Sequence, residues 1–147
     1  MRNDYKIIFD LIPSNSKVLD IGCSSGELLS LLNQKENIQT QGVEINQEKV
    51  VKCLENGLDV VQGDINQILE DFPHNQFDYC LLTKTIQTVN QPDKLLQLLK
   101  KVGKNIIISF DNSNYYKRVI EFAFKGSFDK LLQKSNIKEQ MLLFIML

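Results

Sequence analysis

The sequence predicts an α/β fold with a doubly wound, mainly parallel sheet, and three observations support this. Strand and helix patterns alternate regularly along the chain. The first strand pattern, Lys17–Ile21, leads into a turn of small residues and then a Leu-rich helix pattern. The last strand pattern, residues 105–110, is almost entirely apolar, as expected for a parallel strand that is buried on both faces.

The individual elements follow from periodicity and from residues that begin or end helices. An amphipathic helix over residues 4–11 ends before Pro13, and Gly57 caps a helix over 47–56. Pro92 occupies a first helical turn, where proline is tolerated. The other helices are expected over 27–33, 66–71, 92–101 and 114–125, and the other strands over 39–43, 58–62 and 77–82. Right-handed crossovers between these units place a ligand site at the carboxyl ends of the strands.

The turn after the first strand has the pattern D-x-G-x-S-x-G, from Asp20 to Gly26. Gly22 lets the turn approach a ligand, and Gly26 lets the next helix begin close to the strand. Backbone N–H groups at the start of that helix face any bound anion. The Asp20 carboxylate disfavours a pyrophosphate and suits a cationic or hydroxylated ligand. S-adenosylmethionine, with its ammonium and sulfonium groups, therefore suits this turn better than NAD.

Two other interpretations of the turn are open. Residues 22–26 also match G-x-S-x-G, the nucleophile elbow of α/β-hydrolases. That fold has several strands before its elbow, whereas about twenty residues precede this one, and the single histidine, His74, lies in an expected loop. The alternative without a ligand is a glycine turn that binds nothing, because one glycine motif is weak evidence.

Acidic residues follow two further strands. Glu44 ends the second strand, where a carboxylate can accept both ribose hydroxyls, or can instead act as an acid at a helix N-terminus. Asp64 follows the third strand, where it can accept the adenine amine or act as an N-cap. Together they predict an adenosyl ligand. The expected cofactor-binding residues are Asp20, Gly22, Cys23, Gly26, Glu44, Ile45, Asp64, Ile65 and Thr83, with no catalytic base identified.

Composition limits the remaining possibilities. A chain of 147 residues suits one domain with a real core. A net charge of −1 without a basic stripe argues against nucleic acid, and no apolar run reaches the length that spans a membrane. Three cysteines without paired spacing predict reduced thiols in a cytoplasmic protein. With one histidine and no cysteine cluster, we expect no metal site.

The sequence resembles the MetW family of methionine biosynthesis, within the class I S-adenosylmethionine-dependent methyltransferases. The similarity covers residues 1–126 and rests on segments 1–4, 12–23, 26–29, 42–44, 61–64, 71–73, 77–79, 85–87, 102–103 and 108–110. It implies a Rossmann-like class I methyltransferase fold, S-adenosylmethionine as ligand and an association with homoserine O-acyltransferase. The chain departs from the family at Ser24, which is usually glycine, at Thr83-Lys84, and over residues 111–116.

The resemblance stops at Gly126, so residues 1–126 are expected to form the methyltransferase-like domain and 127–147 a divergent tail that truncates the family's C-terminal hairpin. The apolar segment 141–147 is expected either to cover the fifth strand or to pack in a partner interface, the alternative being a disordered remnant.

Two functions remain open. One is an accessory protein for homoserine O-acyltransferase, and the other is an active methyltransferase with a small-molecule acceptor. Tyr115 and Tyr116 are candidates for lining an acceptor pocket or for helix packing. Because no nucleophile and base pair is evident, any methyl transfer is expected to depend on positioning.

Overall fold

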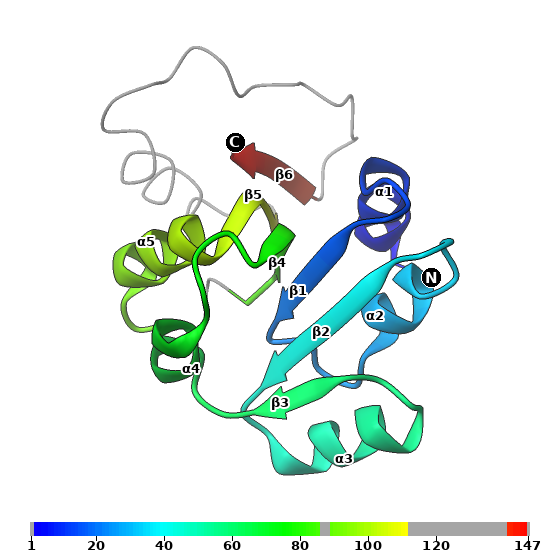
Figure 1. Ribbon diagram of the computed structural model, residues 1–147, viewed down its shortest axis with the longest axis horizontal. Coiled ribbons are helices and arrows are strands. Elements are labelled where there is room, and N and C mark those ends of the chain that lie inside the picture. The colour runs from blue at the N-terminus through cyan, green and yellow to red at the C-terminus, as the bar shows by residue number, and fades with distance from the viewer. Residues whose placement is uncertain (1, 86–88, 112–140, 147) are drawn as a thin grey trace.

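The computed structural model describes residues 2–85, 89–111 and 141–146, and the expected helix over 114–125 with its two tyrosines lies outside this part. The described strands form one six-stranded sheet in the order β3-β2-β1-β4-β5-β6 (Figure 1). They are β1 (Lys17–Ile21), β2 (Gln39–Glu44), β3 (Val60–Gln62), β4 (Phe77–Thr83), β5 (Gly103–Asp111) and β6 (Met141–Met146). The helices are α1 (Asn3–Leu11), α2 (Glu27–Leu32), α3 (Gln47–Glu55), α4 (Ile65–Asp71) and α5 (Pro92–Val102).

The first five strands are parallel, which confirms the predicted doubly wound α/β fold. The chain begins in the middle of the sheet at β1, continues outward to β2 and β3, and then returns to β4 on the other side of β1. Asp20 is therefore paired with Gly42 of β2 on one side and with Leu81 of β4 on the other. The strand order reverses between β1 and β4, which is where ligands bind in open α/β sheets.

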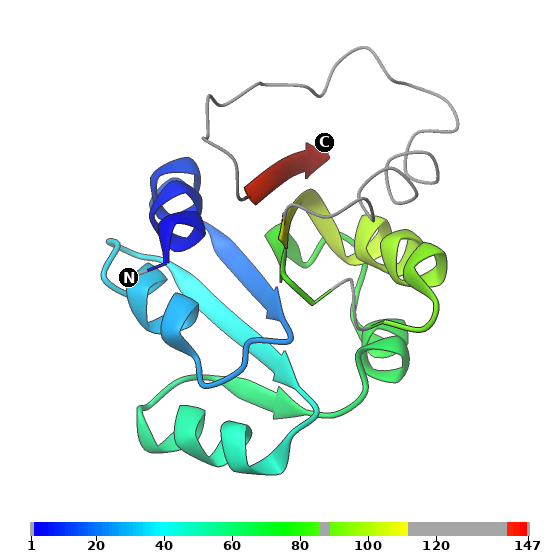
Figure 2. The ribbon, with the colours of Figure 1, turned by 180° about the vertical axis from the view of Figure 1, so that it is seen from behind.

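Helices cover both faces of the sheet, as the two opposite views in Figures 1 and 2 show. On one face, α1 and α2 pack on β1, β4 and β5 through a core that includes Ile8, Leu28 and Ile107. Next to it, α3 packs through Val50 and Cys53. On the other face, α4 and α5 cover the larger core. Burial of each aliphatic side chain contributes roughly 1.5–3 kcal/mol to the free energy of unfolding. The packing on both faces therefore holds the sheet and its strand ends in place.

Most element boundaries agree with the sequence, but β3 begins at Val60 and not at the predicted residue 58. Gly57, with φ +70°, follows the end of α3 as predicted, and its N–H donates to Leu54 O. The Leu58 N–H then donates to Cys53 O at 3.0 Å. Because this amide completes the end of the helix, the strand ladder starts two residues later.

The C-terminal strand β6 runs antiparallel to β5, with Ile106 paired to Met146 and Asp111 paired to Met141. This confirms the expectation that segment 141–146 covers the fifth strand, whose edge would otherwise present unpaired backbone groups. None of the helices in the described ranges has both the length and the apolar character that crossing a bilayer requires.

Candidate functional site

The turn after β1 is anchored to β2 by backbone hydrogen bonds. The N–H groups of Gly22 and Cys23 both donate to Val43 O, at 2.8 and 3.1 Å. Gly22 has φ +72°, and a Cβ added to it would lie 2.5 Å from Thr85 Oγ1. Glycine is required here because the turn has a left-handed backbone and because the segment after β4 approaches it closely.

Gly26 serves the packing of the helix, as its position in the motif predicted. It has φ +80°, and a Cβ here would lie 2.2 Å from Leu58 Cδ1 and 3.0 Å from Cys53 Sγ. Ser24, at the position where we expected glycine in the family, also has a left-handed backbone with φ +52°. A residue with a Cβ adopts this conformation at a cost of roughly 1–2 kcal/mol.

The Glu44 carboxylate connects the glycine turn to the start of α3. Its Oε2 accepts from the Ser24 N–H and its Oε1 from the Asn46 N–H, both at 2.9 Å. The N-cap of α3 is Asn46, whose side chain accepts from the Lys49 N–H. Glu44 is thus not the cap itself. An ionised carboxylate has about four lone-pair positions, so each oxygen retains capacity for a further donor.

Asp64 is the N-cap of α4, which confirms the structural role weighed for it. Its Oδ1 accepts from the backbone N–H of Asn66 at 2.8 Å and from Asn66 Nδ2 at 3.1 Å. The same carboxylate also lines the cavity described below, so capping and contact with a ligand are compatible.

Asp20 lies beneath the turn and is 1 % exposed. Its Oδ1 accepts no hydrogen bond from the described residues. Burial raises the pKa of this carboxyl from 3.8 to about 7, whereas the Arg2 guanidinium acts in the opposite direction. Arg2 is itself paired with Asp4 and donates to the hydroxyl of Tyr5. Ionisation of Asp20 therefore lowers the free energy of unfolding unless a cation lies close to the carboxylate.

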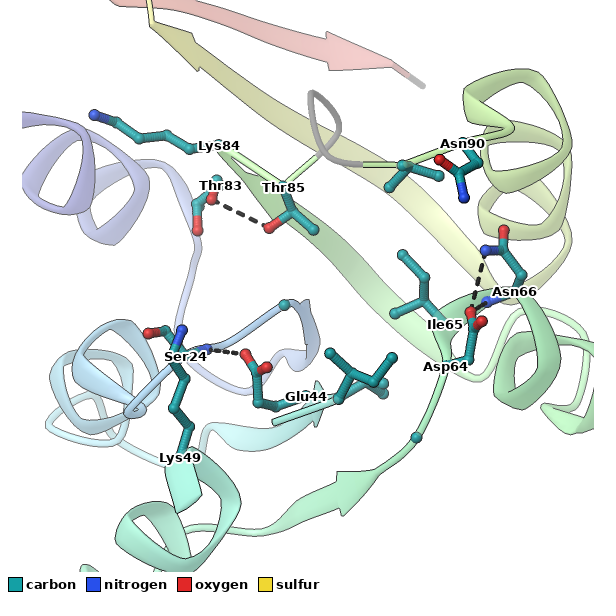
Figure 3. Close-up of a pocket in the computed structure, with 15 residues that line it drawn as sticks. Ser24, Glu44, Lys49, Asp64, Ile65, Asn66, Thr83, Lys84, Thr85 and Asn90 are labelled. Atoms are coloured by element: carbon teal, nitrogen blue, oxygen red, sulfur yellow. Dashed lines mark hydrogen bonds between the residues drawn. The ribbon is translucent and has the colours of Figure 1, made fainter. Parts of the chain in front are cut away.

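A cavity of about 450 Å³ opens at the carboxyl ends of β1, β2, β3 and β4 (Figure 3). This volume lies within the roughly 300–1,000 Å³ that is usual for small-molecule sites. Six of the predicted residues line it, namely Gly22, Glu44, Ile45, Asp64, Ile65 and Thr83. The sheet thus brings together the four strand ends that carry the residues predicted from the sequence.

Three predicted residues, Asp20, Cys23 and Gly26, are absent from the described lining of this cavity. Cys23 is buried, and its Sγ lies 3.9 Å from Ser24 O. Burial raises the pKa of the Cys23 thiol well above its usual value, and that of the neighbouring Cys53 thiol is also raised. A protonated, buried thiol is a poor nucleophile, which agrees with the expectation that any methyl transfer depends on positioning.

The hydrolase interpretation is wrong. His74 is exposed in the turn before β4, at the amino end of that strand, whereas Ser24 follows the carboxyl end of the adjacent strand β1. The two residues therefore lie at opposite ends of neighbouring parallel strands. Among the described residues, no three His, Cys, Asp or Glu side chains gather closely enough to hold a metal ion.

Sequence reasoning missed several lining residues, including Ser24, Lys49, Asn66, Thr85 and Asn90. Lys49 and Asn66 lie in the first turns of the helices that follow Glu44 and Asp64. Their closeness in sequence to Glu44 and Asp64 was the only feature of the sequence that could have indicated a place in the cavity wall. Thr85 lies in one of the segments that resemble the MetW family, and no local pattern distinguishes Asn90.

Comparisons with known proteins agree with this geometry. The family described as "Methionine biosynthesis protein MetW" matches residues 2–133. The chain is 36% identical over 120 residues to the bifunctional methionine biosynthesis protein MetXA/MetW of Rhodopirellula baltica, covering 76% of this chain and 19% of that protein. It is 32% identical over 138 residues to a carboxy-S-adenosyl-L-methionine synthase of Campylobacter concisus, covering 90% of this chain and 55% of that one.

The chain thus spans about a fifth and about half of the length of these two curated relatives. Among solved structures, it superposes on an S-adenosylmethionine-dependent methyltransferase from Aquifex aeolicus with a TM-score of 0.75 at 18% identity. That match covers 97% of this chain and 88% of the other, and it supports the Rossmann-like class I methyltransferase fold. Fold, strand-end site and sequence agree, and the chain belongs to the MetW family of methionine biosynthesis proteins.

Proposed function

We propose that this protein binds S-adenosylmethionine, or its demethylated product S-adenosylhomocysteine, in the cavity at the strand ends. The observation that carries the proposal is the Glu44 carboxylate at the end of β2. Two backbone amides hold it in place, and it lines the cavity. A fixed carboxylate at this position suits the two adjacent hydroxyls of a ribose.

The other residues fit the rest of the ligand. Ile45 is 67% exposed at the cavity, an apolar surface available to an adenine ring, and Ile65 lines the same wall. Asp64 supplies an acceptor for the adenine amine. Gly22 would hold the methionine end directly, and Asp20 would act from beneath the cavity surface, where its Oδ1, which has no hydrogen-bond partner among the described residues, favours a nearby ammonium group. Cys23 and Gly26 would contribute by shaping the turn after β1, and Thr83 by shaping the end of β4.

In the cell we propose an accessory role in methionine biosynthesis, in the cytoplasm, in support of homoserine O-acyltransferase. The bifunctional relative supports this, because its name joins MetXA and MetW in one protein. The three cysteines are free thiols, as suits a reducing compartment. An affinity pull-down of homoserine O-acyltransferase from an extract of the source cells, compared with a β6-deleted variant and with bare resin, tests the association.

The alternative is an active methyltransferase with a small-molecule acceptor. S-adenosylmethionine would supply an activated methyl group on its sulfonium, and the protein would contribute proximity and orientation. The polar residues that follow β4 favour this alternative, because they adjoin the Gly22 turn where the sulfonium end would lie.

Isothermal titration calorimetry with S-adenosylhomocysteine tests the binding proposal directly. We expect saturable binding with one site per chain. The absence of measurable heat, together with an unchanged unfolding temperature at millimolar ligand, would overturn it.

A further inference from the structure

One end of the cavity carries three polar side chains, those of Asp64, Asn66 and Asn90. Asp64 and Asn66 come from the start of α4, whereas Asn90 precedes α5. Their neighbours Ile65 and Val89 pack against the same hydrophobic core, which holds the two segments together. Figure 3 shows the three polar side chains at this end, with the carboxamides of Asn66 and Asn90 directed toward each other.

Asp64 sets the orientation of the Asn66 carboxamide. Asn66 Nδ2 donates to Asp64 Oδ1 at 3.1 Å, and an ionised carboxylate can only accept, so the nitrogen must face this partner. Asn66 Oδ1 therefore points the other way. It is shielded from solvent and has no hydrogen-bond partner among the described residues. A buried acceptor without a donor destabilises a protein, so this oxygen calls for a donor from a side chain beside it.

Asn90 can supply that donor, because a carboxamide carries both an NH₂ group and a carbonyl oxygen. Asn90 is exposed, so its side chain is able to rotate toward Asn66. When Asn90 Nδ2 donates to Asn66 Oδ1, the Asn90 oxygen is left as an acceptor for a ligand in the cavity. Asp64 then orients Asn66, and Asn66 orients Asn90.

We propose that Asn90 is a specificity-determining residue that selects adenine as the base of the bound nucleoside. The exocyclic amine of adenine has two N–H groups, and the Asp64 carboxylate and Asn90 Oδ1 accept one each. Hypoxanthine has an oxygen at the same position and would face two acceptors with no hydrogen between them. Ile45 and Ile65 cannot make this distinction, because any flat base can contact an apolar side chain. The inference rests on the proposed function and names the residues that give its site base specificity.

Calorimetry of the full-length protein with S-adenosylhomocysteine and with S-inosylhomocysteine, in which an oxygen replaces the exocyclic amine, tests this selection. The wild type should prefer the adenine ligand by at least about tenfold, because the inosine ligand leaves buried acceptors unpaired. Asn90→Leu, similar in size but without polar atoms, should lower that preference about fivefold, the effect of one neutral hydrogen bond. Asn66→Leu should lower it too, because Asn90 loses the acceptor that orients its amide. Gln91→Leu is the matched control, since Gln91 is exposed and its side chain makes no capping hydrogen bond.

The ratio of the two affinities is the decisive readout, because a general loss of structure weakens both ligands equally and leaves the ratio unchanged. Equal binding of the two ligands by the wild type would overturn the selection of adenine. A wild-type ratio in Asn90→Leu or in Asn66→Leu, or an equally lowered ratio in Gln91→Leu, would overturn the assignment to Asn90. Each of these results leaves S-adenosylhomocysteine binding intact and the proposed function standing. Absence of binding of either ligand to the wild type would overturn the proposed function and this inference with it.

Discussion

The Glu44 carboxylate accepts a hydrogen bond of 2.9 Å from the backbone N–H of Ser24, twenty residues earlier in the chain. This bond crosses from the end of β2 to the turn after β1. It fixes the shape of the glycine turn and the direction of the carboxylate at the same time. Glu44 therefore holds the turn in place and is also the residue that we propose contacts the ligand.

We expect Glu44→Ala to weaken S-adenosylhomocysteine binding by about 1.5–3 kcal/mol, because hydrogen bonds to a charged acceptor are lost. Stability should also fall by roughly 1–3 kcal/mol, since the amides of Ser24 and Asn46 lose their acceptor. Calorimetry and urea unfolding measure the two effects. Glu48→Ala, an exposed acid on α3, is the matched control. Wild-type affinity in Glu44→Ala would contradict the ribose assignment.

Asp64 offers a test that separates the effect of its capping oxygen from the effect of its charge. Asp64→Asn retains an N-cap acceptor but removes the charge, so stability should change by less than about 0.5 kcal/mol. Asp64→Ala removes the cap and should cost about 1 kcal/mol. Thermal unfolding distinguishes the two substitutions. Equal destabilisation by Asn and Ala would show that the charge of Asp64, and not its capping oxygen, stabilises α4.

The buried Asp20 predicts a pH-dependent stability. Its folded pKa of about 7 exceeds the ordinary value of 3.8. The stability associated with the protonated form is therefore full below pH 4 and is lost as the pH rises through 7. Asp20→Asn should become more stable than wild type across this interval, by about 2–4 kcal/mol above pH 7.

Urea unfolding between pH 4 and 8 measures this difference, with the exposed Asp59→Asn as control. A difference between wild type and Asp20→Asn that does not vary with pH would show that Asp20 ionises normally. Asp20→Asn should also weaken S-adenosylhomocysteine binding, because the carboxylate proposed to hold the ligand ammonium is removed.

Ser24→Gly should stabilise the protein. The left-handed φ of +52° costs a serine roughly 1–2 kcal/mol, and the added freedom of glycine in the unfolded chain offsets roughly 0.4–1 kcal/mol. We expect a net gain of up to about 1 kcal/mol in the free energy of unfolding. Ser25→Gly, at the next position, lacks a positive φ and should destabilise. A loss of stability in Ser24→Gly would mean that the serine side chain makes a compensating contact.

Removal of residues 141–147 should expose the backbone edge of β5, because β6 pairs with residues 106–111 of that strand. We expect a lower unfolding temperature and self-association, seen as earlier elution in size-exclusion chromatography. An unchanged unfolding temperature and elution volume would show that β6 contributes little to the fold in solution.

The sequence by itself determined the parallel sheet, because local patterns encode it. Apolar runs specify buried strands, 3.6-residue periodicity specifies helices, and Gly57 specifies the end of α3. It also placed Gly22, Glu44 and Asp64 at the carboxyl ends of strands. Because the strands are parallel, these ends lie on the same side of the sheet, where the three residues line one cavity. The later start of β3 was missed, since it depends on one backbone amide that bonds to the helix and not to the ladder.

Only the tertiary structure decided what each polar side chain does there. It buried Asp20 near the glycine turn and tied Glu44 to Ser24. It also brought Lys84 and Thr85 to a wall opposite the acids. These outcomes depend on strand register and on contacts between residues far apart in the chain. Neither periodicity nor a local motif carries that information.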